Sequence, residues 1–538
     1  MVASLEGLPA ELLARVVHYV PRPAHLKSLC LVSKTLQNTA TPARYRYVEL
    51  DEHSKGWPDL EVGHGLLSAD KPGLAHVREL CCWNVDPESE TRAAASVRLL
   101  LQYLPWDSLA TFHGSDIPID KATLVALLTQ QTRLKHLILG PLCFDINPLL
   151  QAKAFTEHIW AKLETLSIPK RLDSVQDLVA YRHVIRKAPR LRTLQVSCHD
   201  LGTTDTNTTN SSPESPVFGY LFPPTVGGCL PQPPLKLQKL MLRDIDLTAI
   251  TSRFSDVFDI HSLQSLEIDD CLDWPHLLTD LAGAFAKHGS SLHSFCLTSW
   301  RSCHEPVEQL LRSVKNLRTL HLLSAEHDNP IALNALDGYL ASLVDVFVVY
   351  DWCGTGDYAP GIQQLHEAIA TKMPCLERLG VALPPICILD AAAEESSRHM
   401  SCLRSLVAVP KLELLRIVNW PSMPADSFAD PEEVDNETSR RRSNRALYQY
   451  AVKDFMLSSL QQAFESAKRR PGSCVVCMDS ICDDRGSDGA VKTPVDSLYF
   501  TPGKEADMYG NTRVNALQIT VVEARYFLEC DDMFWAFS

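Results

Sequence analysis

Leu263-Gln264-Ser265-Leu266-Glu267-Ile268 is the clearest copy of a pattern, Leu-x-x-Leu-x-apolar, that decides the fold of this chain. Ten copies occur between residues 134 and 417, and the steps between their first residues run from 25 to 46. Weaker copies at Val77 and Leu109 extend the pattern towards the N-terminus. Its last apolar positions alternate with polar ones, which predicts a short strand with one buried face. Because one such strand cannot bury its apolar side alone, we predict stacked strand–helix units that form a parallel sheet.

The segments between the copies read as helices that would cover one face of this sheet. Val175, Leu178 and Ile185 form an apolar stripe at helical spacing. Pro374 and Pro410 each stand two residues before the first leucine of a copy, where a proline ends a helix. The ten copies begin at Leu134, Leu163, Leu191, Leu237, Leu263, Leu292, Leu317, Leu343, Leu376 and Leu412.

Two polar stretches interrupt the pattern. Residues 199–235, dense in Thr, Ser, Asn, Pro and Gly, account for the longest step and predict a flexible loop. Residues 421–445 run from an acidic cluster into several arginines and predict a polar linker, which we prefer to a nuclear-import signal. We therefore expect a repeat array over residues 70–420. A helix and strands over residues 446–538 would close it.

Composition and charge indicate which partners to expect. The chain has 51 Lys plus Arg against 65 Asp plus Glu, a formal charge of -14, which opposes binding to nucleic-acid phosphates and anionic membranes. No stretch approaches the roughly 18 apolar residues of a membrane span, and the first residues do not resemble a signal peptide. The 17 cysteines, an odd number in apolar contexts, suit free thiols in a reducing compartment. We expect a cytoplasmic and/or nuclear protein that binds neither nucleic acid nor membrane.

The common motifs of catalysis are missing from the sequence. It has no Gly-x4-Gly-Lys-Ser/Thr phosphate loop, no Gly-x-Ser-x-Gly elbow and no His-Glu-x-x-His helix. Cys474-x-x-Cys477-x4-Cys482 has metal-ligand spacing, but too few Cys and His follow it for an eight-ligand zinc RING. We interpret Cys474 to Met478 as one more buried strand. The expectation is a protein with no catalytic site, no metal and no cofactor.

The first fifty residues precede the repeats and read as short helices. Pro9 and Glu11 both favour a helix start, the first by its fixed backbone angle and the second by its charge near the positive helix end. A unit of about 40 residues rarely buries enough surface to be stable alone. We therefore expect an apolar face on residues 5–50 that packs on a partner protein or, as an alternative, on the first repeat as a cap.

Two features together resemble a known family. Leu8-Pro9-x-Glu11-Leu12 and the later Leu31-Val32-Ser33-Lys34 resemble an F-box, although His25 and Leu36 replace the acidic and aromatic residues often found there. The repeated pattern resembles leucine-rich repeats of the cysteine-containing and ribonuclease-inhibitor-like subclasses. The resemblance implies an α/β fold in which a three-helix F-box over residues 1–50 precedes a curved leucine-rich-repeat solenoid. The parallel strands would lie on its concave side and the helices outside.

The resemblance also implies a function, the substrate-recognition subunit of an SCF-type E3 ubiquitin ligase. The F-box would bind a Skp-type adaptor and through it a cullin scaffold, the repeats would bind a target protein, and other subunits would supply catalysis. The residues expected at the adaptor are Leu8, Pro9, Glu11, Leu12, Val16, Leu29, Leu31, Val32 and Lys34. The residues expected at the target, which stand between and beside the buried strand positions, are Arg243, Glu267, Asp269, His321, Asp345, Phe347, Arg378 and Arg416.

Two alternatives from other classes stay open. One is a scaffold that works outside ubiquitin transfer and whose repeats bind a partner that is never modified. The other is a leucine-rich-repeat GTPase activator or enzyme inhibitor, and it alone predicts that residues 5–50 are dispensable for function.

Overall fold

The computed structural model places the chain in two compact units, which are described separately. Unit 1 is residues 1–263 with 270–277, and unit 2 is residues 264–269 with 278–538. The described residues are 5–20, 23–51, 73–83, 90–114, 117–139, 159–168, 171–172, 175–197, 200–201, 217–223, 233–248, 254–299, 304–324, 332–350, 360–388, 393–419, 421, 437–478, 497–506, 512–520 and 524.

Three short helices open unit 1. They are α1 (Ala10–His18), α2 (Pro23–Val32) and α3 (Lys34–Arg46), after a single turn η1 (Leu5–Gly7). Val17, Leu26 and Ala40 form their buried core. Ser33 caps α3, because its Oγ accepts a hydrogen bond of 3.2 Å from the backbone N–H of Leu36. The three helices expected at the N-terminus are therefore present.

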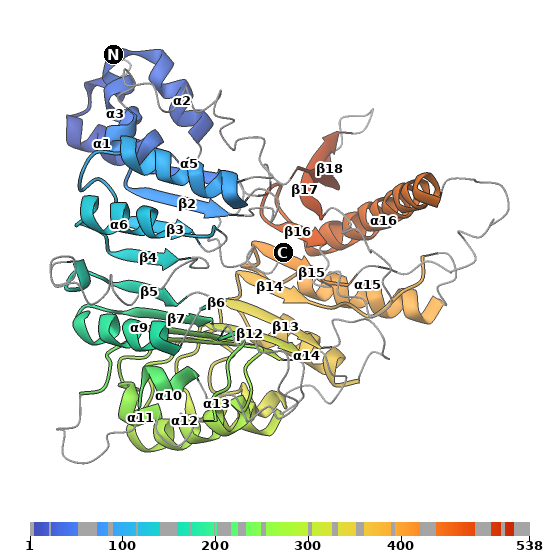
Figure 1. The fold of residues 1–538 in the computed structure, drawn as a ribbon. Coiled ribbons are helices and arrows are strands. Elements are labelled where there is room, and N and C mark those ends of the chain that lie inside the picture. The colour runs from blue at the N-terminus through green and yellow to red at the C-terminus, as the bar shows by residue number, and fades with distance from the viewer. Residues whose placement is uncertain are drawn as a thin grey trace. The chain divides into compact units, whose positions relative to one another are not determined.

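The rest of unit 1 is a parallel sheet with helices along one side (Figure 1). Its strands, in spatial order, are β1 (Tyr47–Asp51), β2 (Glu79–Trp83), β3 (Thr111–Gly114), β4 (His136–Leu139), β5 (Thr165–Ile168), β7 (Thr193–Ser197) and β9 (Lys239–Arg243). A separate parallel pair is β6 (Arg171–Leu172) and β8 (Asp200–Leu201). The helical elements are η2 (Leu74–His76), α5 (Glu90–Tyr103), α6 (Lys121–Gln130), α9 (Val175–Lys187), α10 (Val217–Leu221) and α11 (Phe254–Val257).

Unit 2 repeats the arrangement and ends in a hairpin. Its parallel strands are β10 (Ser265–Asp269), β11 (Ser294–Ser299), β12 (Thr319–Ser324), β13 (Asp345–Tyr350), β14 (Arg378–Val381), β15 (Leu414–Ile417) and β16 (Val475–Met478). β17 (Leu498–Ala506) and β18 (Thr512–Ile519) follow antiparallel. Its helical elements are α12 (Trp274–His288, which begins in unit 1), α13 (His304–Ser313), η5 (Leu333–Ala335), α14 (Pro360–Lys372), α15 (Ala393–Val407) and α16 (Glu437–Ala467). Figure 1 shows α14, α15 and α16 along one side of these strands.

One backbone carbonyl in each repeat fixes the register of the next. The carbonyl oxygen of Arg318 accepts hydrogen bonds from Val344 N (2.9 Å) and Asp345 N (3.1 Å). In unit 1 the carbonyl oxygen of Glu164 accepts in the same way from Arg192 N (2.8 Å) and Thr193 N (3.0 Å). Because equivalent residues make equivalent bonds, the leucines of successive copies stack in line, as in solenoid-like α/β folds.

The ten copies of the pattern all coincide with parallel strands, which confirms that part of the prediction. The weaker copies at Val77 and Leu109 lead into β2 and β3, and the segment after Cys474 is the buried strand β16. β1 was not expected, although Val48 and Leu50 show the strand alternation and are buried. None of the described helices is long and apolar enough to cross a membrane.

Two segments differ from their expected conformation. Within the expected loop 199–235, residues 217–221 form α10, and Phe218 is buried in a stack with Phe222. Residues 202–216 and 224–232 lie outside the described part of the chain. The expected linker 421–445 ends early, because α16 begins at Glu437 rather than near Ala446. Arginine favours helix and no Gly or Pro follows Glu437 within the helix, so the charged run continues it.

Candidate functional site

Helix α1 is apolar on two sides. Leu13 and Val17 are buried in the three-helix core. Leu12 and Val16, spaced four residues apart and therefore on one face, are exposed, with 46% of Leu12 accessible. Leu8, just before the helix, is exposed as well. A helix that only covered a core would not need this second stripe. The exposed stripe is therefore the first candidate binding feature.

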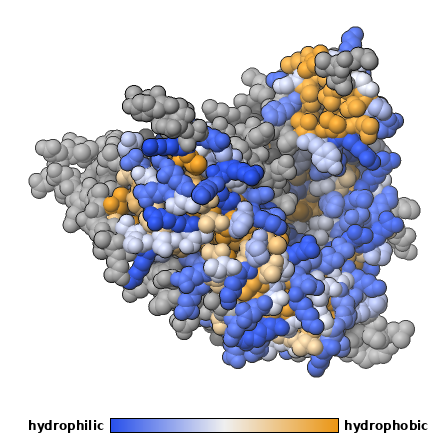
Figure 2. Space-filling model, turned by 180° about the vertical axis from the view of Figure 1, so that it is seen from behind, coloured by the Kyte–Doolittle hydropathy of each residue, from blue (hydrophilic) through white to orange (hydrophobic). Residues whose placement is uncertain are grey.

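Further exposed apolar residues lie in the same region. Leu5 lies in the turn η1 before the helix, and Tyr19 follows the end of α1 and is 81% exposed. Leu31 and Val32, at the end of α2, are 81% and 67% exposed. We call these four residues, together with Leu8, Leu12 and Val16, the N-terminal apolar face. Figure 2 shows hydrophobic side chains gathered in a patch over the N-terminal helices, which is typical of a protein-binding surface.

The residues expected at the adaptor contact are not all equivalent in the structure. Leu29 is half-buried and packs against the core of Val17, Leu26 and Ala40, so it is largely a structural residue. The remaining members are exposed: Leu8, Pro9, Glu11, Leu12, Val16, Leu31, Val32 and Lys34. Leu5 and Tyr19 were not predicted, although the spacing of Tyr19 from Leu12 and Val16 could have indicated that residue.

A second candidate lies on unit 2, where one row of residues crosses four strands. The register aligns His321 of β12, Phe347 of β13, Gly380 of β14 and Arg416 of β15 as direct neighbours. Their side chains alternate with core leucines, so they share the other face of the sheet. We call it the non-helical face. Among the described residues, its buried cluster has no member from α13, α14, α15 or α16.

Asp345 is the polar centre of this face. Its Oδ1 lies 2.9 Å from His321 Nε2, and its Oδ2 lies 3.2 Å from Arg378 Nε. The second contact is an ion pair that lacks hydrogen-bond alignment. Side-chain exposure is 8% for Asp345 and 31% for Arg378. The carboxylate therefore joins three strands, β12, β13 and β14, through one buried charge.

Phe347 occupies the space that Gly380 leaves open. The aromatic ring lies over the glycine, because a methyl group at Gly380 would overlap ring atoms Cδ2 and Cε2 of Phe347. The ring of His321 meets Phe347 edge-on at 5.9 Å between centroids. The guanidinium of Arg416 lies 5.5 Å from the ring centroid on the other side, within the range of a cation–π contact.

The structure brings together five of the eight residues expected at a target: His321, Asp345, Phe347, Arg378 and Arg416. Of these, Arg378 alone is more than one-tenth exposed, which differs from the open binding surface that the sequence predicted. Glu267 and Asp269 lie on β10 of the same unit, with Glu267 buried. Arg243 is half-buried on β9 of unit 1.

A Cys–His pair between α14 and α15 has the geometry, but not the electrostatics, of an activated nucleophile. Cys402 Sγ lies 2.9 Å from His366 Nδ1. Burial raises the pKa of the Cys402 thiol to about 12 and lowers the pKa of His366 to about 4. An activated thiolate needs the opposite shifts. The pair is thus a neutral S–H···N hydrogen bond that joins two helices.

His366 makes stability depend on pH. Its pKa of about 4 in the folded chain lies below its ordinary value of 6.5, so unfolding takes up a proton between these pH values. The contribution is present above pH 6.5 and is lost as the pH falls towards 4, by about 3 kcal/mol. We expect His366→Gln to flatten the fall in urea-unfolding free energy between pH 6.5 and 4.5. The exposed His293→Gln should leave the fall unchanged, and an equal fall in both variants would contradict the assignment.

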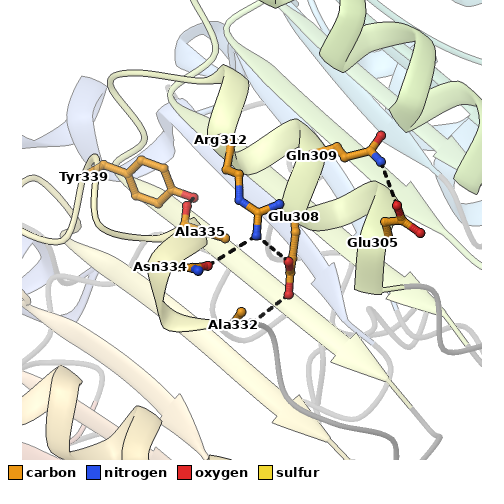
Figure 3. A network of polar contacts seen from close by, with 8 residues as sticks. All are labelled: Glu305, Glu308, Gln309, Arg312, Ala332, Asn334, Ala335 and Tyr339. Atoms are coloured by element: carbon orange, nitrogen blue, oxygen red, sulfur yellow. Dashed lines mark hydrogen bonds and ion pairs between the residues drawn. The ribbon is translucent and has the colours of Figure 1, made fainter.

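Another polar network joins two elements of unit 2. In Figure 3, Glu308 Oε1 accepts from Ala332 N (2.8 Å) and its Oε2 accepts from Arg312 (2.7 Å), which also donates to Asn334 (3.3 Å). This network joins α13 to the segment with η5. The described part of the chain contains no group of three or more His, Cys, Asp or Glu placed to hold a metal ion. Cys482 lies outside the described residues.

No protein-family model matches this sequence, and no curated protein matches it either. The N-terminal apolar face and the non-helical face are therefore the features that bear on function.

Proposed function

We propose that this protein is the substrate-recognition subunit of an SCF-type E3 ubiquitin ligase. Residues 1–50 act as an F-box that binds a Skp-type adaptor, which in turn binds a cullin scaffold. The strand–helix units are leucine-rich repeats that bind a target protein. The chain itself supplies no catalysis; it raises the effective concentration of target lysines near a ubiquitin-charged enzyme carried by other subunits.

The observation that supports this proposal most directly is the exposed stripe of Leu12 and Val16 on α1, with Leu8 just before the helix. These leucines and the valine lie within the F-box-like sequence but outside the core of the three helices. The stripe is thus available to a partner, and a partner that buries it gains roughly 25 cal/mol for each Å² of apolar area. The repeats that follow offer a long series of strands on which a second protein could dock.

The test is capture of a Skp-type adaptor by the full chain. We expect the triple variant Leu8→Ala, Leu12→Ala, Val16→Ala to bind at least about 100-fold more weakly, because three central apolar contacts are lost. All three side chains are exposed, so the thermal midpoint should change little.

A matched control removes other exposed apolar side chains of unit 1. Tyr103→Ala, Trp106→Ala and Leu272→Ala should leave adaptor binding unchanged. If the intact chain captures no adaptor, the ubiquitin-ligase proposal is wrong. Residues 5–50 would then be a cap on a protein-binding repeat array, such as a scaffold.

A further inference from the structure

The connections that enter four successive strands of unit 1 carry a cation at the same position. The residue directly before the first leucine of the pattern is basic and exposed in the copies that lead into β4, β5, β7 and β9: Arg133, Lys162, Arg190 and Lys236. We call these four residues the basic row. In the six later copies this position is basic once, and its residues are Ser262, Ser291, Asn316, Ser342, Cys375 and Lys411. The basic row is therefore a local feature and not a requirement of the repeat.

Backbone hydrogen bonds align the basic row from strand to strand. The carbonyl oxygen of Lys135 accepts from Glu164 N (2.7 Å), and that of Glu164 accepts from Arg192 N (2.8 Å). The carbonyl oxygen of Arg192 accepts in turn from Gln238 N (2.7 Å). Each member of the basic row stands two residues before one of these aligned residues, so the four cations are aligned as well. Neighbouring strands are about 4.8 Å apart, so the row spans about 14 Å.

Little in the described part of these connections offsets the positive charge. Six exposed cations and one carboxylate lie in the four connections, at residues 131–135, 160–164, 188–192 and 233–238. The carboxylate belongs to Glu164, whose Oε1 already accepts from Lys135 Nζ at 2.9 Å. Asp107, in the neighbouring connection, accepts from Thr132 N (2.8 Å) and Thr132 Oγ1 (2.6 Å). The chain as a whole has a formal charge of -14, so this strip is positive on an acidic protein.

The charge of the basic row opposes folding instead of supporting it. Like charges at aligned positions of neighbouring strands repel one another and destabilise a sheet. Lys162 Nζ donates to the backbone oxygen of Thr132 at 3.2 Å, and a neutral donor could make the same bond. Because the fold gains nothing from four cations in line, their arrangement indicates a ligand of opposite charge.

The length and chemistry of the basic row fit an extended acidic segment of a protein. An extended chain advances about 3.4 Å per residue, so about five residues cover the row. The guanidinium groups of Arg133 and Arg190 can each bind a carboxylate through two parallel hydrogen bonds. The ammonium groups of Lys162 and Lys236 attract carboxylates as point charges. Alternation of arginine and lysine thus offers a carboxylate partner at each strand.

A nucleic acid fits the basic row less well. The net negative charge of the chain repels a long polyanion more than a short acidic segment. Proteins that bind single strands also stack successive bases on aromatic side chains. The described residues of the four connections expose no Phe, Tyr or Trp, because Trp160 is buried, and the neighbouring connection into β3 exposes Trp106. One aromatic residue beside the row suits an apolar side chain that flanks an acidic segment.

We propose that the basic row is a docking surface for an extended acidic segment of a partner protein. Carboxylates of that segment bind the guanidinium and ammonium groups of Arg133, Lys162, Arg190 and Lys236. The assignment of the partner as the target protein rests on the proposed function. On that basis the target carries a run of Asp and Glu residues in an exposed, extended segment.

The test measures binding of a labelled oligoglutamate, about ten residues long and so longer than the row, to the full chain at low ionic strength. The row variant is Arg133→Gln, Lys162→Gln, Arg190→Gln, Lys236→Gln. We expect it to bind at least about tenfold more weakly than the intact chain, because four ion pairs are lost. Added salt should weaken binding to the intact chain, because charged groups form the contact. Equal binding to both proteins, or no binding to the intact chain, would overturn the proposal.

A matched control makes the same change of net charge elsewhere. The variant Lys121→Gln, Lys287→Gln, Lys315→Gln, Lys372→Gln removes four exposed lysines and should bind oligoglutamate within about twofold of the intact chain. An equal loss in both variants would mean that binding follows net charge, which overturns the proposal. The row variant should resist urea at least as well as the intact chain, because repulsion is relieved. A clear loss of stability would contradict a row that serves a ligand.

A labelled single-stranded oligothymidylate of similar charge separates the two classes of partner. We expect it to bind the intact chain more weakly than oligoglutamate does. Tighter binding of the oligothymidylate, lost in the row variant, would overturn the acidic-segment proposal and assign the basic row to nucleic acid.

Failure of this inference is distinguishable from failure of the proposed function. Adaptor capture depends on the N-terminal apolar face and should be equal for the intact chain and the row variant. Oligoglutamate binding without adaptor capture would overturn the ubiquitin-ligase proposal and keep the docking surface. Adaptor capture without oligoglutamate binding would do the reverse.

Discussion

Replacing Gly380 by alanine is expected to destabilise unit 2 by about 3 kcal/mol, at the upper end of ordinary overpacking costs. The new methyl group would overlap the ring of Phe347. That ring is fully buried between His321 and Arg416, so it cannot move aside without disturbing both contacts. Urea unfolding of the full chain would measure the loss.

Two comparisons isolate the cause. Gly283→Ala, in α12 with open space around the new methyl group, should instead stabilise by roughly 0.5 to 1 kcal/mol through helix propensity. Phe347→Ala should make Gly380→Ala nearly neutral, because the overlapping ring is gone, although Phe347→Ala itself creates a cavity. If Gly380→Ala alone changed the unfolding free energy no more than Gly283→Ala does, the stack of Phe347 on Gly380 would be wrong.

The sequence could place Phe347 and Arg416 on one face, but it could not pair them. Strand alternation puts both opposite the core leucines, and this agrees with the structure. Their contact depends on β14 lying between them with a glycine at the aligned position, and register across strands depends on loop lengths and tertiary packing. The sequence therefore did not indicate that the ring of Phe347 lies over Gly380.

Local composition explains the other differences between the predicted and the observed elements. Residues 199–235 read as a loop on average, but Val217 to Phe222 is a short apolar run within it. Phe218 is buried and stacks on Phe222, which in turn contacts Phe258. Charge patterning marked the arginines before Arg445 as a linker, although arginine is also a good helix former. Composition averaged over a long window hides such short segments.

In the N-terminal region, the sequence indicated the apolar residues but not their burial. The pattern from Leu8 to Lys34 predicted which apolar residues belong together, but not which of them form the core. Leu29 and Leu31 are two residues apart on α2 and therefore lie on different sides of the helix. Leu29 packs against the core, whereas Leu31 is exposed. Two apolar stripes on one helix look alike in sequence, and the arrangement of α3 decides which stripe is buried.

Removal of the Asp345 carboxylate should have the second large effect, a loss of about 3 kcal/mol for Asp345→Ala. The substitution leaves the buried His321 ring and the Arg378 guanidinium without this acceptor. Asp345→Asn, which keeps one oxygen acceptor, should lose less. The exposed Asp337→Ala should change the unfolding free energy by under about 0.5 kcal/mol.

Urea unfolding of the full chain measures the effect of Asp345→Ala. A loss of unfolding free energy no larger than that of Asp337→Ala would contradict the assignment of Asp345 as the group that joins β12, β13 and β14.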